Sequence, residues 1–355
     1  MIINTKNKTI SATSPTYFIA DIAANHDGDL ARALDLIELA AKAGANAAKF
    51  QHFKAETIVS DYGFRDLGAG LAHQKKWEKS VVEVYRDAEL PLEWTHELKQ
   101  KCDDLGIDFF SAIYDLDYLE KLSHLMPFFK IGSGDLTWAS MLERTAAYGK
   151  PMFIATGASS MADVHQAMRL VSKFNIDICL MQCNTNYTGA DNNPHYANLR
   201  VLSEYRRYYP NVILGLSDHT STTITTLGAV ALGATVIEKH FTDDRTRKGP
   251  DHSFSLDYEM WSKMVEEVRE LEASLGDGTK RVEENEIESQ VVQRRAARVI
   301  KKIEKGETIT SEHITYLRPC PPGAATPFDL IGTESIIAKS SLEVEEHIPR
   351  EWLSI

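Results

Sequence analysis

The sequence has little of what marks a disulfide-bonded, metal-cluster or membrane protein. Only four of its 355 residues are cysteines, and Cys102, Cys179, Cys183 and Cys320 are scattered without metal-ligand spacing. Apolar residues make up 43% and charged residues 25% of the chain, so the composition suggests neither disorder nor a membrane span. These absences leave an ordinary globular protein as the expected class.

Basic residues are outnumbered by acidic residues, 39 to 51, and the formal net charge is -12. A chain this acidic is a poor match for a nucleic-acid backbone, although a small anionic substrate needs only a locally basic pocket. The first residues, Met1-Ile2-Ile3-Asn4, lack the basic stretch and apolar core of a signal peptide. We therefore expect a cytoplasmic protein that binds neither nucleic acid nor membrane.

Short apolar runs alternate with helical patterns along most of the chain. Eight such alternations over about 260 residues predict an α/β fold, the (β/α)8 TIM barrel. A doubly wound sheet would need a G-x-G-x-x-G loop after the first strand, where this chain has residues 21–28, DIAANHDG. The expected strands are Phe18–Ala23, Ala47–Gln51, Asp108–Ser111, Phe129–Ile131, Met152–Ala155, Ile178–Met181, Ile213–Leu216 and Val236–Glu238.

The chain divides into a large and a small part by composition. Residues 1–278 hold the barrel, and residues 1–15 are expected to form a hairpin at its bottom. Residues 279–290 are polar and charged and are typical of a linker. Residues 291–355 contain short strands and turns, and about 65 residues bury only a modest core. We expect this small domain to pack on the barrel or on another subunit.

Two histidines follow neighbouring expected strands in equivalent positions. One ends Gly215-Leu216-Ser217-Asp218-His219, and the other ends Val236-Ile237-Glu238-Lys239-His240. Adjacent parallel strands lie about 5 Å apart, so the pair could hold one metal ion or one substrate oxygen. Two histidines satisfied at a domain surface are the alternative. The polar groups Ser217, Asp218 and Glu238 beside them favour a functional site.

Two lysines, Lys49 and Lys130, lie near the ends of the second and fourth strands. One lysine there could be a Schiff-base nucleophile, whereas two are more simply explained by an anion carrying phosphate and carboxylate. Ser133 and Ser217 would add hydrogen bonds to the same anion. A structural salt bridge remains the alternative for Lys49.

Three carboxylates accompany these groups. Asp21 and Asp135 follow the first and fourth strands, and each could be a general base, a metal neighbour or a hydroxyl acceptor. The turn Gly249-Pro250-Asp251-His252 could close over the site with Asp251 reaching inward, or it could be a loop tip without a role.

These features together resemble the sialic acid synthase family, the phosphoenolpyruvate-dependent nonulosonic acid synthases. The C-terminal part is similar to the antifreeze-like (SAF) domain of that family, with Lys305-Gly306-Glu307 and Arg318-Pro319 as its marks. The motifs that carry the resemblance in the barrel are Ala24-Asn25-His26-Asp27-Gly28, Lys49-Phe50-Gln51, Lys130-Ile131-Gly132-Ser133-Gly134, Ala155-Thr156-Gly157, Gly215-Leu216-Ser217-Asp218-His219, Glu238-Lys239-His240-Phe241-Thr242 and Gly249-Pro250-Asp251-His252.

The resemblance implies a metal-dependent condensation of phosphoenolpyruvate with an N-acyl amino hexose. The acceptor would be N-acetylmannosamine-like or a modified or deoxy analogue, and the product a nine-carbon sialic-acid-type sugar plus phosphate. Mn²⁺ or Mg²⁺ would bind His219 and His240, and Arg318 would enter the site of the partner subunit in a homodimer with exchanged C-terminal domains. The implied catalytic groups are Asp21, Lys49, Lys130, Asp135 and Glu238, and the implied substrate-binding groups are Ser133, Asn184, Asn186, Tyr187, Ser217, Asp251 and Arg318.

The chain also departs from the family pattern at several site positions. Asp21 and Asp135 stand where glutamate is common, and Ser111-Ala112-Ile113-Tyr114 replaces Ser-Thr-Pro-Phe, which removes a hydroxyl near the expected phosphoenolpyruvate site. The family asparagine has shifted, so its role could fall to Asn184 or Asn186. These changes suggest an altered acceptor sugar. A Schiff-base aldolase or a non-catalytic carbohydrate-binding relative remain the alternative functions.

Overall fold

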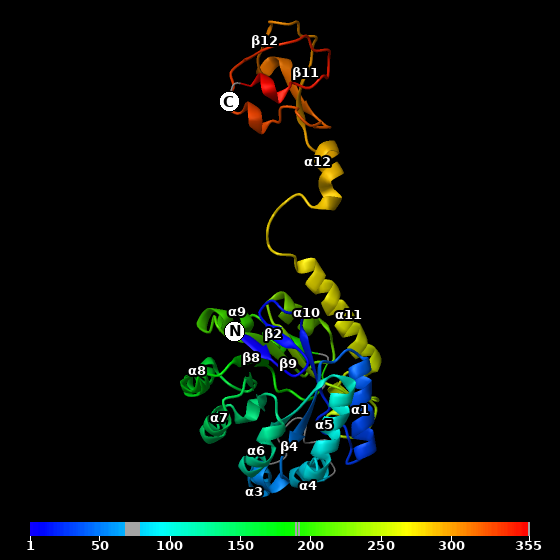
Figure 1. The fold of residues 1–355 in the computed structure, drawn as a ribbon, viewed down its shortest axis with the longest axis vertical. Coiled ribbons are helices and arrows are strands. Elements are labelled where there is room, and N and C mark those ends of the chain that lie inside the picture. Colours follow the sequence, from blue (N-terminus) through cyan, green and yellow to red (C-terminus); the bar gives the residue numbers. More distant parts are fainter. Residues whose placement is uncertain (68–78, 189, 191, 354–355) are drawn as a thin grey trace. The chain divides into compact units, whose positions relative to one another are not determined.

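The computed structural model describes residues 1–67, 79–188, 190 and 192–353. The chain forms two compact units, Met1–Gly276 and Asp277–Ile355 (Figure 1). Within these described residues, no helix has both the length and the apolar character needed to cross a bilayer.

The first unit is built around a closed barrel of eight parallel strands, which confirms the predicted barrel over the doubly wound sheet. Its last strand closes on its first, with Val236 opposite Tyr17 and His240 opposite Asp21. The strands, in chain order around the barrel, are β3 (Tyr17–Asp21), β4 (Ala47–His52), β5 (Asp108–Ile113), β6 (Phe129–Ile131), β7 (Met152–Ala155), β8 (Ile178–Cys183), β9 (Ile213–Asp218) and β10 (Val236–His240).

Helices surround these strands (Figure 1), and several of them, α1, α6, α8 and α11 among them, begin with a capping side chain. Asp257 caps the last barrel helix by accepting from Met260 N, and Trp261, Met264 and Val268 form its buried stripe. The helices are α1 (Leu30–Lys42), α5 (Thr95–Leu105), α6 (Leu116–Leu122), α7 (Ala139–Ala146), α8 (Met161–Val171), α9 (Val201–Tyr208), α10 (Ile224–Ala231) and α11 (Tyr258–Leu275), with α2 (Ala55–Ile58), α3 (Asp61–Asp66) and α4 (Val81–Asp87) inserted after β4.

Several strands extend further than their apolar runs predict. Ser217 and Asp218 belong to β9, and Glu238 and His240 belong to β10, whereas the sequence places most of these groups at or beyond the strand ends. A polar side chain does not end a strand when a neighbouring strand supplies its partner. Asp218 accepts from Lys239 Nζ of β10 at 2.6 Å, and both side chains are buried.

A hairpin of β1 (Ile2–Asn4) and β2 (Thr9–Ser11) precedes the barrel. Its Ile3 and Ile10 are fully buried in the barrel core. The Asn7 amide donates to Asp108 at the start of β5, over 3.0 Å, so the hairpin lies at the amino-terminal ends of the strands. The opposite end, where the polar groups gather, stays available for a ligand.

The second unit has its own small core, which includes Val299, Ile303, Ile309 and Ile348. Two antiparallel pairs form it: β11 (Ala296–Val299) with β13 (Ile314–Leu317), and β12 (Thr308–Ile309) with β14 (Ile336–Ile337). The polar segment 279–290 is partly helical, since α12 (Ile287–Gln293) begins within it.

The buried pair of Asp218 and Lys239 fixes the two strands that carry the histidines. Lys239 Nζ also donates to the Thr220 and Thr222 carbonyls at 2.8 and 3.1 Å. Lys239→Met leaves Asp218 buried without its cation, so we expect unfolding free energy to fall by about 3–5 kcal/mol. Urea denaturation measures this loss.

Two controls accompany that variant. Asp218→Asn combined with Lys239→Met removes both charges and is expected to lose much less stability. Lys263→Met alters an exposed lysine of α11 and is expected to change little. A wild-type denaturation curve for Lys239→Met alone would show that the pair does not hold the strands together.

Candidate active site

A cluster of charged groups occupies the carboxyl end of the barrel interior. Glu238 Oε1 lies 3.4 Å from Lys49 Nζ and 3.3 Å from Lys130 Nζ, and it accepts from Ser217 Oγ at 3.1 Å. Lys49 Nζ also lies 2.6 Å from Asp21 Oδ2. All five side chains are buried, and they come from β3, β4, β6, β9 and β10. The barrel therefore brings together the two lysines and two of the acids, Asp21 and Glu238, that the sequence singled out.

Burial and mutual attraction set the protonation of this cluster. Burial alone would raise the pKa of Glu238, but Lys130 and Lys49 hold it down to about 2. Burial would lower the pKa of Lys49, but Asp21 and Glu238 raise it above its ordinary value. Burial, reinforced by Glu238 and opposed by Lys49, raises the pKa of Asp21. Lys49 is held as a cation, whereas an imine-forming lysine must be neutral.

Two oxygens in this cluster lack a partner. Asp21 Oδ1 and Glu238 Oε2 are buried and accept no hydrogen bond from any described residue. A buried carboxylate oxygen without a donor costs free energy, and such atoms are common where a ligand or water completes the site. The cluster is therefore incomplete as a purely structural salt bridge.

The two histidines stand beside the charged cluster with their ring centroids 5.3 Å apart. His219 Nδ1 lies 2.8 Å from the Asn184 carbonyl oxygen, which can only accept, so that nitrogen carries the proton and Nε2 keeps its lone pair. Tyr187 packs on His219 at 4.4 Å and Phe254 packs on His240 at 4.8 Å, between ring centroids. Apolar rings thus hold both imidazoles in place.

His240 is surrounded by acids. Its Nε2 lies 3.5 Å from Asp21 Oδ2, and its Nδ1 lies 3.9 Å from Asp251 Oδ2. That Nδ1 is buried and has no hydrogen-bond partner among the described residues. Burial lowers the pKa of His240 to about 3 although Asp251 opposes the shift, so the imidazole is neutral. Asp251 also accepts from Ala24 N at 3.2 Å, which ties its turn to the end of β3.

These imidazoles fit a divalent cation. Each keeps a nitrogen lone pair for a metal, and the His219 carbonyl contact is the usual arrangement behind a metal-bound histidine. Burial lowers the pKa of His219, but the nearby Cys183 outweighs it and the net shift is upward, so a proton competes with a metal there. No set of three His, Cys, Asp or Glu residues in the described chain forms a complete metal cage. Water or substrate oxygens would have to supply further ligands.

The turn after β6 carries Ser133 and Asp135. Ser133 Oγ accepts from Gly157 N at 2.9 Å, which joins this turn to the end of β7. Burial raises the pKa of Asp135 to about 6, because no cation in the described residues offsets it. Asp135 therefore titrates near neutral pH, unlike an ordinary aspartate.

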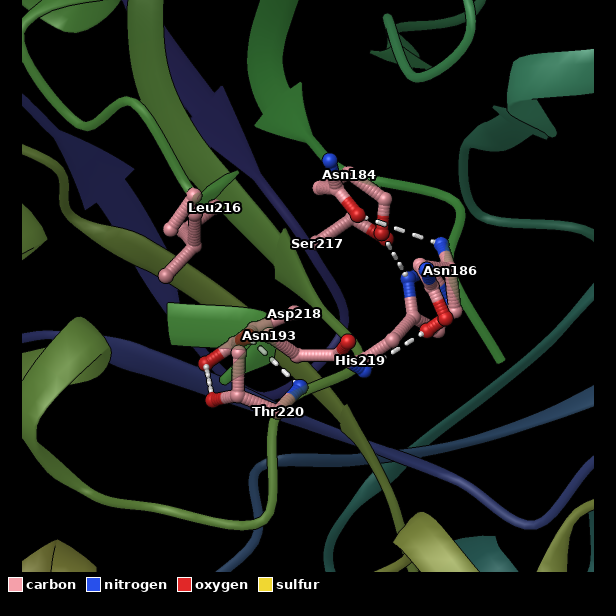
Figure 2. Close-up of a pocket in the computed structure, with 9 residues that line it drawn as sticks. Asn184, Asn186, Asn193, Leu216, Ser217, Asp218, His219 and Thr220 are labelled. Atoms are coloured by element: carbon pink, nitrogen blue, oxygen red, sulfur yellow. Dashed lines mark hydrogen bonds between the residues drawn. The ribbon is translucent and has the colours of Figure 1, made fainter. Parts of the chain in front are cut away.

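The loop after β8 presents its backbone to His219 (Figure 2). Asn184 and Asn186 face His219 across a small pocket at the end of β9. The Asn184 side chain accepts from Asn186 N at 3.2 Å, and the Asn186 side chain accepts from Thr188 Oγ1 at 2.6 Å. The two side chains thus shape their own loop, and the Asn184 carbonyl is what contacts His219.

The sequence did not reveal several site neighbours. Cys183 Sγ lies 3.7 Å from His219 Nδ1, and Phe254 packs against both imidazoles, yet no local pattern marks either residue. Only the closed barrel brings them beside the histidines. Arg318 belongs to the second unit, where it directly follows β13.

An eight-stranded barrel with buried lysines, acids and paired histidines at its carboxyl end defines a barrel enzyme. The sequence matches the NeuB family over residues 36–280. It is 33% identical to the N-acetylneuraminate-9-phosphate synthase of Homo sapiens, covering 92% of this chain and 90% of that protein. It is 32% identical to the N,N'-diacetyllegionaminic acid synthase of Campylobacter jejuni, covering 86% and 90%.

A solved structure agrees with these relatives. The sialic acid synthetase of Leptospira borgpetersenii, in complex with citrate, matches with a TM-score of 0.71 and 29% identity over 81% of this chain and 95% of that chain. The chain therefore belongs to the NeuB family, and the resemblance carried by its motifs is confirmed.

The raised pKa of Asp135 generates a prediction for stability. Folding favours the protonated carboxyl, so the folded protein loses stability as pH rises from about 4 through about 6. Asp135→Asn removes that penalty, and we expect the variant to match wild type near pH 4 and to exceed it by about 1–3 kcal/mol at pH 8. Denaturation at both pH values measures the difference.

Asp163→Asn is the matched control, because the Ser160 cap lowers the pKa of Asp163 and no gain at pH 8 is expected. If Asp135→Asn is less stable than wild type at pH 8, Asp135 is held by a partner and its carboxylate is structural.

Proposed function

We propose that this protein condenses phosphoenolpyruvate with an N-acyl amino hexose to give a nine-carbon sialic-acid-type sugar and phosphate. The observation that carries the proposal is the buried Lys49, Lys130 and Glu238 cluster beside the His219 and His240 pair. The NeuB family membership supports it. No other arrangement in the described residues combines fixed cations for an anion with two metal-type ligands.

Phosphoenolpyruvate would be held by Lys49, Lys130, Ser133 and Ser217. Both lysines already project into the barrel interior, and their position is fixed by the Glu238 carboxylate. An ammonium held in place before the substrate arrives stabilises anionic oxygens without reorganisation during the reaction. Glu238 and Asp21 would keep the lysines oriented, so that the phosphate and carboxylate of the substrate select one binding geometry.

The reaction balances as a condensation with C–O cleavage. C3 of phosphoenolpyruvate forms a bond to the aldehyde carbon of the acceptor, and the positive charge that develops at C2 is met by water. The C2–O bond to phosphorus then breaks, and inorganic phosphate leaves behind a 2-keto acid. Asp135 would accept the proton of the water, since a pKa of about 6 leaves it ionised but still basic at neutral pH.

His219 and His240 would hold Mn²⁺ or Mg²⁺, which supplies Lewis acidity to the carbonyl oxygen of the acceptor when bound. The protein orients these imidazoles from behind, through the Asn184 carbonyl on His219 and the packing of Phe254 on His240. Asp21 and Asp251, on either side of His240, would add negative charge that favours a cation there.

The acceptor sugar would enter from the side of the 249–253 turn. A cavity of about 750 Å³ lies there, and its walls include Tyr187, Arg247, Gly249 and Pro250. Such a volume admits a sugar larger than N-acetylmannosamine. The shorter acids Asp21 and Asp135 withdraw their carboxylates by about one bond length, 1.5 Å. We therefore propose a modified or deoxygenated N-acyl hexose as the preferred acceptor.

Phosphate release tests this function directly. Purified protein is given phosphoenolpyruvate, Mn²⁺ and a panel of N-acyl hexosamines, and we expect phosphate and a nine-carbon product with at least one sugar. Excess chelator is expected to stop turnover, and added Mn²⁺ or Mg²⁺ to restore it. His240→Ala is expected to lose activity by about 100-fold or more, whereas His165→Ala on α8 is the matched control.

Three outcomes would contradict the proposal. Full turnover in excess chelator would show that the reaction needs no metal ion. Inactivation by borohydride only in the presence of substrate indicates a Schiff-base aldolase instead. Absence of turnover with every sugar, despite binding of phosphoenolpyruvate, favours a non-catalytic relative.

We also propose a homodimer with exchanged C-terminal domains, in which Arg318 serves the barrel of the partner subunit. Arg318 follows β13 in a unit whose core is small, and a cation there suits an acyl or carboxyl oxygen of the substrate. The proposal rests on the implied role of Arg318 in the family.

Mixing variants tests the exchange. We expect inactive Arg318→Ala and His240→Ala proteins to regain part of the activity when unfolded and refolded together, because each hybrid dimer contains one intact site. His240→Ala mixed with Lys49→Ala is the control. Both substitutions lie in the barrel domain, so neither site of the hybrid dimer is intact and no activity should return. A fully active monomer in sedimentation experiments would rule out the exchange.

A further inference from the structure

Tyr114 lies directly against the turn that carries Ser133 and Asp135. A Cβ atom placed on Gly132 would come within 2.6 Å of the Tyr114 hydroxyl oxygen and 2.8 Å of its Cε1. Only glycine therefore allows the tyrosine to reach over this turn. The ring is held from the other side by Phe53, with 6.4 Å between ring centroids.

The strand register shows which way Tyr114 points. Ala112 of β5 pairs with Lys130 of β6, and Lys130 points into the barrel because its Nζ reaches Glu238. Neighbours in register point to the same face of a sheet, and side chains two residues apart share that face. Ala112 therefore lies on the inner side of β5 beside Lys130, and Tyr114, which directly follows β5, lies one level further on beside Gly132.

The Tyr114 hydroxyl is chemically free. None of the described residues hydrogen-bonds to it, although the ring is partly buried. Burial, and then the nearby carboxylates of Asp135, Asp21 and Glu238, raise the pKa of Tyr114 well above its ordinary value. The hydroxyl therefore keeps its proton and can donate it, and a free donor one level beyond Ala112, the register partner of Lys130, suits an anionic ligand.

We propose that the Tyr114 hydroxyl is a phosphoenolpyruvate-binding group of this protein, donating a hydrogen bond to an anionic oxygen held by Lys130. From its place directly after β5, it supplies the hydroxyl that Ala112, one level below, does not have. This assignment rests on the proposed function, because it takes phosphoenolpyruvate as the substrate. It also gives Gly132 a role, since any side chain there would displace the tyrosine.

Tyr114→Phe is the informative variant, because it keeps the ring over Gly132 and removes only the hydroxyl. We expect its dissociation constant for phosphoenolpyruvate, measured by calorimetry without sugar, to rise roughly tenfold or more. The KM for phosphoenolpyruvate should rise with it, while the KM for the sugar stays unchanged. Tyr148→Phe, which removes an exposed hydroxyl after α7, is the matched control.

A second variant distinguishes binding from packing. Ala112→Thr introduced into Tyr114→Phe restores a hydroxyl on the same face, and we expect it to recover part of the lost affinity. Unchanged affinity in Tyr114→Phe, or a change confined to the KM of the sugar, would overturn the assignment. If Tyr114→Phe loses affinity only together with its melting temperature, the hydroxyl is structural and the assignment is wrong. If the wild type does not bind phosphoenolpyruvate at all, the proposed function itself fails.

Discussion

The site depends on one shared carboxylate. Glu238 lies between Lys49 and Lys130, and two buried ammonium groups without it would repel each other and lose solvation without compensation. With it, both lysines are paired with one carboxylate inside the barrel and face the same small volume. Burying these charges costs free energy that an apolar core would not spend, and this cost supports the proposal that the cluster binds substrate.

The register of three adjacent strands sets which side chains of β3, β9 and β10 meet. β10 pairs with β3 and β9 so that His240 lies opposite Asp21, Glu238 opposite Ser217, and Lys239 opposite Asp218. A slip of one residue would turn Glu238 out of the barrel and Lys239 into it, because side chains alternate between the two faces. The outward pair of Lys239 and Asp218 is satisfied by its own contacts, which makes that slip costly.

The barrel could be predicted because its strands are short apolar runs and helical patterns alternate with them, some marked by a capping side chain such as Asp257. The carboxyl-end rule for barrels then identified Lys49, Lys130, His219 and His240 without any coordinates. Some strand ends could not be placed: β9 extends past Leu216 to Asp218, whose buried carboxylate is paired with Lys239 on the neighbouring strand.

Other features depend on packing between distant segments. The Asn184 carbonyl behind His219 is a backbone group, which a residue pattern does not reveal. Tyr114 over Gly132 joins two strands, and neither residue alone signals the contact. The helices α2, α3 and α4 after β4 were missed, because the sequence there has no long periodic apolar face.

The proposed reaction is a condensation in which phosphoenolpyruvate loses its phosphate by C–O cleavage. Phosphoenolpyruvate labelled with oxygen-18 in the bridge between C2 and phosphorus, incubated with an accepted sugar, tests it most directly. The account predicts that the label leaves with inorganic phosphate, as a ³¹P NMR isotope shift, while a nine-carbon 2-keto acid accumulates unlabelled at C2. Label retained at C2 of the product, or labelled phosphate without a nine-carbon product, would contradict it.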